Sequence, residues 1–294
     1  MQSELFHHIL QKYWGFTSFR PLQEEIIQSV YDGKDTLGLM PTGGGKSLTF
    51  QVPAMAMEGL CLVVTPLIAL MKDQVDNLKE RGIKAAAVYS GMSRDSILTT
   101  LENCIFGGYK FLYVSPERLT SELFLIKLQA MKVSLLVVDE SHCISQWGYD
   151  FRPSYLNIAE IRKHLPGIAV LALTATATNE VVADIQSKLL FEKPNVFRKS
   201  FERKNLSYVV RYSENKIAEL INILNAVDGT AIVYVRSRKE TQNIAEQLIK
   251  NGINASFFHA GLSYEQKIFK QNEWKFDQCR VIVSTNAFGM GIDK

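Results

Sequence analysis

The stretch Met40-Pro41-Thr42-Gly43-Gly44-Gly45-Lys46-Ser47 decides the fold of this chain. An apolar run, residues 36–40, precedes it and an apolar segment, residues 48–57, follows it, which is the order strand, glycine-rich loop, helix. Consecutive glycines let backbone N–H groups turn toward one oxyanion, Lys46 adds a positive charge, and Ser47 offers a hydroxyl to a phosphate-bound Mg²⁺. The stretch therefore predicts a nucleoside triphosphate site rather than a turn with an incidental lysine. Met40 stands where the general phosphate-loop pattern has its first glycine.

Length and composition bound the class of protein. The 294 residues allow two domains with separate cores, and 47% hydrophobic with 21% charged residues is ordinary globular composition. A net charge of +3 permits a nucleic-acid partner without arguing for one. The four cysteines form no Cys-x-x-Cys pair, so we expect a reducing compartment and no thiolate zinc site within the chain. We also expect no membrane association, because no signal peptide or sufficiently long apolar run is present.

Beyond the glycine loop, strand-like apolar runs alternate with helix-like segments. Because the runs are continuous rather than alternating, they predict an α/β fold with a mostly parallel sheet covered on both faces. The runs are residues 60–64, 85–89, 111–114, 135–138 and 169–173, with helical spacing in 67–80 and 93–105. Polar residues follow most of these strands, at the edge where open α/β sheets bind ligands. That edge would carry Thr65, Ser115, Asp139, Glu140, Thr174 and Thr176.

The composition changes over residues 195–204, where charged residues surround Phe201. We interpret this run as a solvated linker. A second alternation of helices and strands follows between residues 218 and 283, without a second glycine–lysine loop. We therefore predict two tandem domains, residues 1–200 and 201–294.

The acidic pair Asp139-Glu140 at the end of a buried strand complements the glycine loop. Asp139 can hold Mg²⁺ through its water shell opposite Ser47, and Glu140 can polarise a water molecule for attack on the γ-phosphate. The alternative, an acidic pair that caps a helix, is less favoured once the loop is present upstream.

The most distinctive segment follows the acidic pair: Ser141-His142-Cys143-Ile144-Ser145-Gln146-Trp147-Gly148-Tyr149-Asp150-Phe151-Arg152-Pro153. Its mixture of polar residues, large aromatics, Gly and Pro is typical of a loop. An aromatic loop beside a hydrolytic site can stack on nucleic-acid bases and report their presence to the γ-phosphate. Alternatively, Trp147 and Phe151 pin the loop onto the core.

These motifs resemble those of the RecQ family of superfamily-two DNA helicases, over essentially the whole chain. The matching stretches are MPTGGGKS (40–47), TPLIALMKDQV (65–75), YVSPERL (113–119), DESHCISQWGYDFRPSY (139–155), LTATAT (173–178), FHAGL (258–262) and STNAFGMGIDK (284–294). The aromatic-rich loop is the family's own signature. Ser141 replaces the usual alanine of the Asp-Glu-Ala-His box and leaves both carboxylates in place. The resemblance implies two tandem RecA-like domains of the P-loop NTPase type with mostly parallel sheets, the second one incomplete.

The resemblance also implies roles for individual residues, with ATP and Mg²⁺ as cofactors. The catalytic group would be Lys46, Asp139, Glu140 and His142, with Ser47 and Asp139 on the metal. The nucleotide would be held by Phe16, Arg20 and Gln23 at the adenine, by Thr42, Gly43, Gly44, Gly45, Lys46 and Ser47 at the phosphates, and by Asp293 at the ribose. DNA contact and coupling would fall to Thr65, Ser115, Trp147, Phe151, Arg152, Thr174, Thr176, Arg236, His259 and Thr285.

The implied function is an ATP-dependent 3′–5′ DNA helicase for repair or recombination. Its partners would be single-stranded DNA and tailed duplexes, and it would act as a monomer in the bacterial cytoplasm, associated with the nucleoid. The family's arginine-finger stretch, Gln-x-x-Gly-Arg-x-Gly-Arg, does not occur in the 294 residues, so we expect weak hydrolysis and little unwinding from this chain. The alternatives are a nucleotide-gated clamp without motor activity and an RNA helicase. A small-molecule kinase has less support, because no lid or acceptor pocket is evident.

Overall fold

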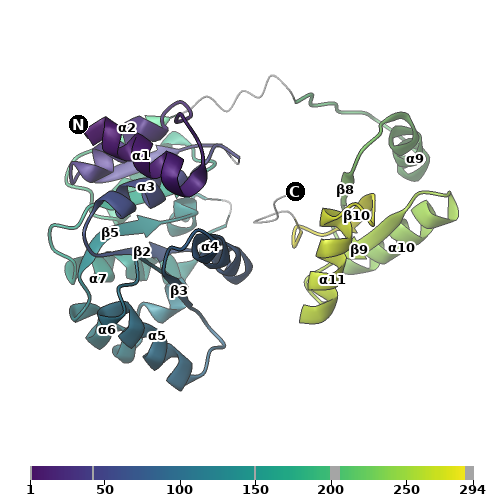
Figure 1. Cartoon of the computed structure of the whole chain (residues 1–294). Helices are drawn as coiled ribbons and strands as arrows, with labels where there is room; N and C mark the ends of the chain where they lie inside the picture. Colours follow the sequence, from purple (N-terminus) through teal and green to yellow (C-terminus); the bar gives the residue numbers. More distant parts are fainter. Residues whose placement is uncertain (1, 42, 149, 199–205, 289–294) are drawn as a thin grey trace. The chain divides into compact units, whose positions relative to one another are not determined.

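The computed structural model divides the chain into two compact units, residues 1–203 and 204–294 (Figure 1). It describes residues 2–41, 43–148, 150–198 and 206–288. Thr42, Asp293 and the predicted domain boundary at residue 200 lie outside the described residues.

The first unit is built on a seven-stranded sheet in the order β3-β4-β2-β5-β6-β1-β7. Every strand pair in it is parallel, as the continuous apolar runs predict. All five residues of β2, for example, are buried. The strands are β1 Thr36–Leu39, β2 Leu60–Val64, β3 Ala85–Val88, β4 Phe111–Val114, β5 Val133–Val138, β6 Val170–Thr174 and β7 Val196–Arg198.

Helices cover both faces of this sheet (Figure 1). On one face, Ile26 of α2, Phe50 of α3 and Met71 of α4 pack in a cluster with strand residues such as Val63. The other face carries α5, α6, α7 and α8, and its cluster includes Leu62. The bounds are α2 Gln23–Tyr31, α3 Leu48–Ala56, α4 Ile68–Glu80, α5 Arg94–Phe106, α6 Glu122–Gln129, α7 Asn157–Lys163 and α8 Asn179–Lys188.

Helix α1 (Gln2–Trp14) forms an additional layer over α2 and α3. Phe6 and Leu10 of α1 are fully buried against Ile27 and Val52, and Tyr13, Trp14 and Phe19 border the same cluster. Most of the aromatic residues that precede the glycine loop are therefore core residues. Phe16 differs from them, because its side chain is 51% exposed.

The interpretation of residues 195–204 as a solvated linker is wrong at its start. Val196–Arg198 form β7, an edge strand that pairs in parallel with β1. Asn195 anchors it, because its side-chain Nδ2 donates hydrogen bonds at 2.9 Å to the Asp35 carbonyl and to the Ser29 hydroxyl. A three-residue strand inside a charged run gives no periodicity signal, since its stability comes from tertiary contacts.

The second unit contains a smaller parallel sheet of three strands in the order β8-β10-β9. Leu224, Leu248 and Val283 belong to its apolar cluster. The rings of Trp274 and Phe288 also pack against each other edge to face, with centroids 5.4 Å apart. The elements are α9 Lys216–Ala226, β8 Ala231–Tyr234, α10 Arg238–Lys250, β9 Ala255–Phe258, α11 Tyr264–Lys275 and β10 Val281–Ser284.

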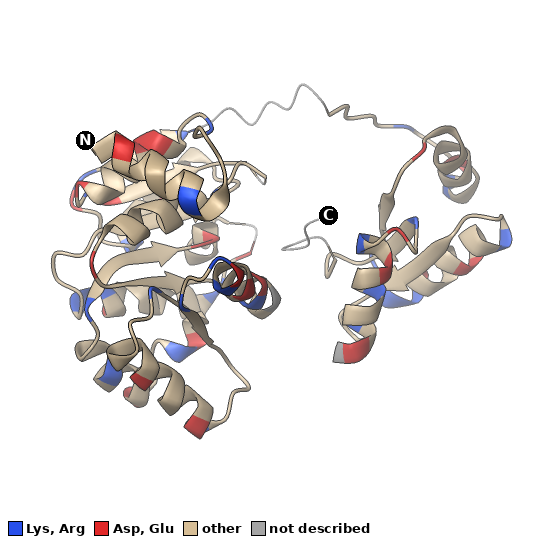
Figure 2. Ribbon diagram, viewed as in Figure 1, with Lys and Arg blue, Asp and Glu red and all other residues tan. Residues whose placement is uncertain are grey.

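Charged residues of both signs are interspersed along the helices of both units (Figure 2). This mixture accords with the small net charge of +3. Among the described residues, no helix combines the length and the apolar character that crossing a bilayer requires.

Candidate nucleotide site and the loop beside it

The glycine loop connects β1 to α3 as the sequence predicts. Gly43 and Gly45 have φ angles of +76° and +78°, in the region that side chains with a Cβ avoid. A Cβ on Gly44 would lie 2.8 Å from the Pro41 carbonyl oxygen. Each of the three glycines is therefore required by the backbone. Met40 is fully buried in the cluster beneath the loop, so it serves as an apolar anchor at the position of the pattern's first glycine.

Two of the three predicted adenine residues, Arg20 and Gln23, contact the glycine loop. Gln23 is almost fully buried, and its Nε2 donates to the Gly45 carbonyl at 3.0 Å while its Oε1 accepts from the Arg20 backbone N–H at 2.8 Å. The Arg20 guanidinium donates to the Gly43 carbonyl at 2.6 Å. In this arrangement the Gln23 amide orients the loop. Its pairing with adenine stays a prediction.

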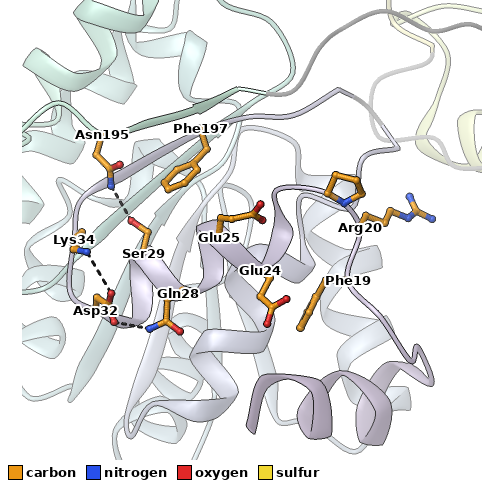
Figure 3. Close-up of a pocket in the computed structure, with 11 residues that line it drawn as sticks. Phe19, Arg20, Glu24, Glu25, Gln28, Ser29, Asp32, Lys34, Asn195 and Phe197 are labelled. Atoms are coloured by element: carbon orange, nitrogen blue, oxygen red, sulfur yellow. Dashed lines mark hydrogen bonds and ion pairs between the residues drawn. The ribbon is translucent and has the colours of Figure 1, made fainter. Parts of the chain in front are cut away.

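A cavity of about 870 Å³ lies along α2 (Figure 3). Glu24 and Phe19 lie near one end, and Asp32 and Lys34 lie at the other. No described residue of the glycine loop lines this cavity, and the cavity's carboxylates would repel a triphosphate. We therefore expect the phosphates at the loop, although Arg20, a predicted adenine residue, also lines the cavity.

The acidic pair follows β5 directly and faces the loop lysine. Lys46 Nζ lies 3.5 Å from Glu140 Oε1, and both side chains are largely buried. Glu140 has a left-handed backbone with φ of 47°, and its N–H donates to the Asp139 carboxylate at 2.9 Å. Strain of this kind in a non-glycine residue is typical of functional sites. Burial, reinforced by the Glu140 charge, raises the pKa of Asp139 to about 6, although Lys46 acts in the opposite direction.

His142 joins the acidic pair to the end of β6. Its Nδ1 lies 3.3 Å from Glu140 Oε2 and 2.9 Å from the Thr174 hydroxyl. Burial lowers the pKa of His142, outweighing the nearby carboxylates of Glu140 and Asp150, so the imidazole is neutral at pH 7. The Thr174 hydroxyl in turn donates to the Thr176 carbonyl at 3.1 Å. A continuous path of polar contacts therefore runs from Lys46 to Thr176.

The aromatic loop presents one ring to solvent and is tied down by an arginine. Trp147 is 78% exposed, whereas Phe151 is half-buried. Arg152 pairs with Asp150 at 2.9 Å and donates to the Pro66 carbonyl at 3.3 Å, which connects the loop to the residue after Thr65 at the end of β2. The exposed Trp147 therefore does not pin the loop onto the core, and Phe151 is only partly buried. Arg152, which that interpretation did not include, ties the loop to the end of β2.

Thr65 and Ser115 are buried, and they follow β2 and β4 directly. Because the sheet is parallel, both lie at the same edge as the glycine loop and the acidic pair. In the second unit, Arg236, His259 and Thr285 come just after β8, β9 and β10, so they share one edge of the smaller sheet. Their contact with DNA stays a prediction.

Two residues that the sequence analysis did not assign also shape the site. Tyr155 is fully buried and its hydroxyl donates to the Asp139 carbonyl at 2.9 Å, which fixes the backbone of the acidic pair. Gly148 packs so closely that a Cβ would lie 2.6 Å from the His142 carbonyl oxygen. The only sequence signal for either was its place within the segment 139–155.

We expect Gly148→Ala to displace the aromatic loop and to destabilise the first unit by about 1–3 kcal/mol, the usual cost of overpacking. Urea denaturation followed by circular dichroism measures the loss. Gly261→Ala is a matched control, because its nearest neighbour is the flexible end of Arg238 at 3.0 Å. Equal unfolding midpoints for Gly148→Ala and the unaltered chain would contradict the close packing.

A partly buried lysine at the end of a glycine loop, facing an acidic pair at the carboxyl ends of parallel strands, defines a P-loop nucleoside triphosphatase. Comparison with known families narrows this class. Residues 20–185 match the family model described as DEAD/DEAH box helicase, and residues 215–294 match the model described as Helicase conserved C-terminal domain. The chain belongs to the DEAD/DEAH box helicases, and it is similar to the helicase core of RecQ-type proteins.

The curated relatives support this assignment. The chain is 43% identical over 290 residues to a protein named probable ATP-dependent DNA helicase RecS, from Bacillus subtilis, with 97% of the chain and 58% of the relative covered. It is 45% identical over 291 residues to the ATP-dependent DNA helicase RecQ of the same organism, covering 97% of the chain and 49% of the relative. The chain thus spans about half the length of these relatives.

Solved structures share the fold. A structure of Mycobacterium smegmatis helicase Lhr bound to ssDNA and AMP-PNP aligns with a TM-score of 0.73 and 20% identity, over 98% of this chain and 42% of that one. A crystal structure of the DUF1998 helicase MrfA bound to DNA aligns with a TM-score of 0.76 and 18% identity, over 100% of this chain and 46% of that one. The likeness establishes two RecA-like helicase domains, the second short.

Proposed function

We propose that this chain is the motor core of an ATP-dependent 3′–5′ DNA helicase that acts in repair or recombination. The observation that carries the proposal is the path of contacts from Lys46 through Glu140 and His142 to Thr174. This path joins the glycine loop to the segment that holds the aromatic loop. A conformational change at Lys46 or at Thr174 would therefore be transmitted to the other residue through Glu140 and His142, which are already in contact.

The donor set of the site suits Mg-ATP. Lys46 and the N–H groups of Gly43, Gly44 and Gly45 would bind the phosphates, and Ser47 and Asp139 would hold Mg²⁺. The fit of Asp139 rests on its carboxylate, whose pKa is raised by burial and by the Glu140 charge, so that additional positive charge nearby would be favourable. Bound Mg²⁺ would supply that charge and neutralise the phosphates. Glu140 would accept a proton from the attacking water, and Phe16, Arg20 and Gln23 would select adenine.

The nucleic-acid side of the proposal rests on exposure and position. Trp147 offers its exposed ring for stacking. We propose DNA contact or coupling also for Phe151, Arg152, Thr65, Ser115, Thr174 and Thr176. Arg236, His259 and Thr285 of the second unit would contribute to DNA contact, and Asp293 would contact the ribose of the nucleotide. We propose single-stranded DNA and tailed duplexes as partners, a monomeric state, and a place in the bacterial cytoplasm at the nucleoid. The DNA helicase relatives and two structural neighbours solved with DNA support this choice over RNA.

We expect Trp147→Ala to weaken the binding of single-stranded DNA roughly 5- to 150-fold, since stacking on one base contributes about 1–3 kcal/mol. Fluorescence anisotropy of a labelled oligonucleotide, with a non-hydrolysable ATP analogue present, measures this affinity. Stability should not change, because the ring is 78% exposed.

Phe106→Ala is the matched control for this experiment. Phe106 is 85% exposed at the end of α5, the opposite edge of the sheet from the loop, so its loss should leave DNA affinity unchanged. Equal DNA affinities for Trp147→Ala and the unaltered chain would refute stacking by Trp147. Tighter binding of an RNA of the same sequence would favour the RNA helicase alternative.

A further inference from the structure

Cys143 has no role in the proposed mechanism, yet its thiol lies between two possible metal ligands. Its Sγ is 3.8 Å from His142 Nε2 and 3.8 Å from Asp150 Oδ2. The three ligand atoms all lie within 4.8 Å of one another, and no other group of three His, Cys, Asp or Glu side chains in the described ranges does this. Ligand atoms of a tetrahedral zinc site are about 3.4–3.6 Å apart, given the usual Zn–S and Zn–N bond lengths. Small side-chain adjustments would therefore complete the geometry.

The surroundings of the cluster resemble the outer shell of a metal site. His142 directs Nδ1 at the Thr174 hydroxyl and the Glu140 carboxylate, which leaves Nε2 on the side of Cys143. Metal-binding histidines usually donate their second ring N–H to such a partner. Asp150 is held by the Arg152 guanidinium, with contacts of 2.9 and 3.2 Å. Both Arg152 contacts are to Asp150 Oδ2, the oxygen that also faces Cys143, so a metal bound to that oxygen would share it with the guanidinium.

We propose that His142, Cys143 and Asp150 form a binding site for a thiophilic divalent cation such as Zn²⁺, and that its occupancy inhibits the coupling of ATP hydrolysis to DNA. On binding, the Cys143 S–H bond breaks, the sulfur–metal bond forms and the proton passes to solvent, with no change of oxidation state. The three protein ligands leave a fourth position for water. Metal binding is independent of the proposed helicase function, whereas the inhibition rests on it.

The ligand types distinguish this site from the Mg²⁺ site at the glycine loop. A thiolate and an imidazole favour Zn²⁺ and Co²⁺, whereas Mg²⁺ selects oxygen ligands. Burial raises the pKa of the Cys143 thiol to about 12, so the thiol is protonated until a metal displaces the proton. His142, one of the three ligands, also lines a cavity of about 400 Å³ together with Trp147 and Gly148. The expectation of no zinc site rested on the absence of a cysteine pair and does not apply to a site with one thiolate.

The metal would inhibit the coupling of ATP hydrolysis to DNA because of the two residues that it holds together. His142 lies on the path between Glu140 and Thr174, and Asp150 lies in the aromatic loop. A metal that bridges them fixes the loop relative to the acidic pair. The glycine loop would still bind nucleotide, because Lys46 and Ser47 are not ligands of this metal.

Titration of the 294-residue chain with Co²⁺, without nucleotide or DNA, tests the site. We expect a sulfur-to-cobalt charge-transfer absorption that saturates at one equivalent and disappears when Zn²⁺ is added. Cys143→Ala should abolish this band. Cys104→Ala is the control, because Cys104 is also buried but is no part of such a group, and it should retain the band. No band in the unaltered chain, or an unchanged band in Cys143→Ala, would overturn the site.

Asp150→Asn provides a second variant in case Cys143→Ala does not fold. It keeps the thiol and the side-chain volume, and the loss of a ligand should weaken Co²⁺ binding by more than the roughly 10–100-fold that an outer-shell change costs. Unchanged affinity would contradict the ligand assignment. The inhibition is tested by measuring ATP turnover in the presence of single-stranded DNA. Zn²⁺ should lower the turnover of the unaltered chain and should not change the turnover of Cys143→Ala. Metal binding without loss of DNA stimulation would refute the inhibition alone.

Discussion

Glu140→Gln is expected to lower ATP turnover about 10²–10⁴-fold while ATP binding persists. The substitution removes the carboxylate that would accept the proton of the attacking water, and it preserves the shape of the side chain. It also removes the negative partner of Lys46, which lies 3.5 Å away, so the lysine stays available for the phosphates. Single-turnover hydrolysis of radiolabelled ATP measures the loss, and binding of a fluorescent ATP analogue measures the affinity.

Glu160→Gln serves as the control, because Glu160 pairs with Lys163 on the surface of α7 and should not affect turnover. The experiment also separates a motor core from a nucleotide-gated clamp. A motor core has hydrolysis that Glu140→Gln removes, whereas a clamp has none to lose. Turnover that survives in Glu140→Gln would mean that another group is the general base.

Asp139→Asn is expected to stabilise the nucleotide-free chain at neutral pH while it abolishes stabilisation by Mg-ATP. Burial, with the Glu140 charge, raises the pKa of Asp139 to about 6, above that of an unfolded aspartate near ~4. The folded state therefore binds the proton more tightly, so this group's contribution to stability falls as the pH rises from about 4 to about 6 and is constant above. The neutral amide removes a cost on the order of 1–3 kcal/mol.

Thermal unfolding at pH 5 and pH 7.5, with and without Mg-ATP, measures both effects. The stabilising effect of Asp139→Asn should be larger at pH 7.5 than at pH 5. Asp35→Asn is the control of opposite sign, because Asp35 is buried but paired with Arg162 at 2.5 Å. Its neutralisation should destabilise the chain by about 3–5 kcal/mol. A lower unfolding temperature for Asp139→Asn at pH 7.5 would contradict the assignment of Asp139 as an uncompensated carboxylate.

Much of the fold could be predicted because buried parallel strands are continuous apolar runs. The predicted runs at residues 60–64 and 111–114 coincide with β2 and β4. Helices α6, α7 and α8 have weaker apolar patterns and were missed. For α8 a helix-start signal was present, because the Thr178 side chain caps the helix by accepting from the Val181 N–H. The three-residue strand β7 was missed because only its pairing with β1 defines it.

The site could be predicted as a set of residues but not as a network. The positions of the strand ends in the sequence indicated which side chains share the carboxyl edge of the sheet. The structure places Lys46 beside Glu140, as their positions after β1 and β5 imply. The contact between His142 and Thr174 joins residues 32 positions apart, so no local pattern reveals it. The burial of Gln23 under the glycine loop and the hydrogen bond from Tyr155 to Asp139 likewise depend on tertiary packing.

ATP turnover with and without single-stranded DNA tests the central claim most directly. If the path from Lys46 to Thr174 couples the two ligands, single-stranded DNA should raise turnover of the 294-residue chain roughly 5- to 150-fold, the range of coupling energies of 1–3 kcal/mol. An RNA of the same sequence should have a much smaller effect. Turnover that does not respond to DNA, or responds equally to RNA, would contradict a DNA-coupled motor core.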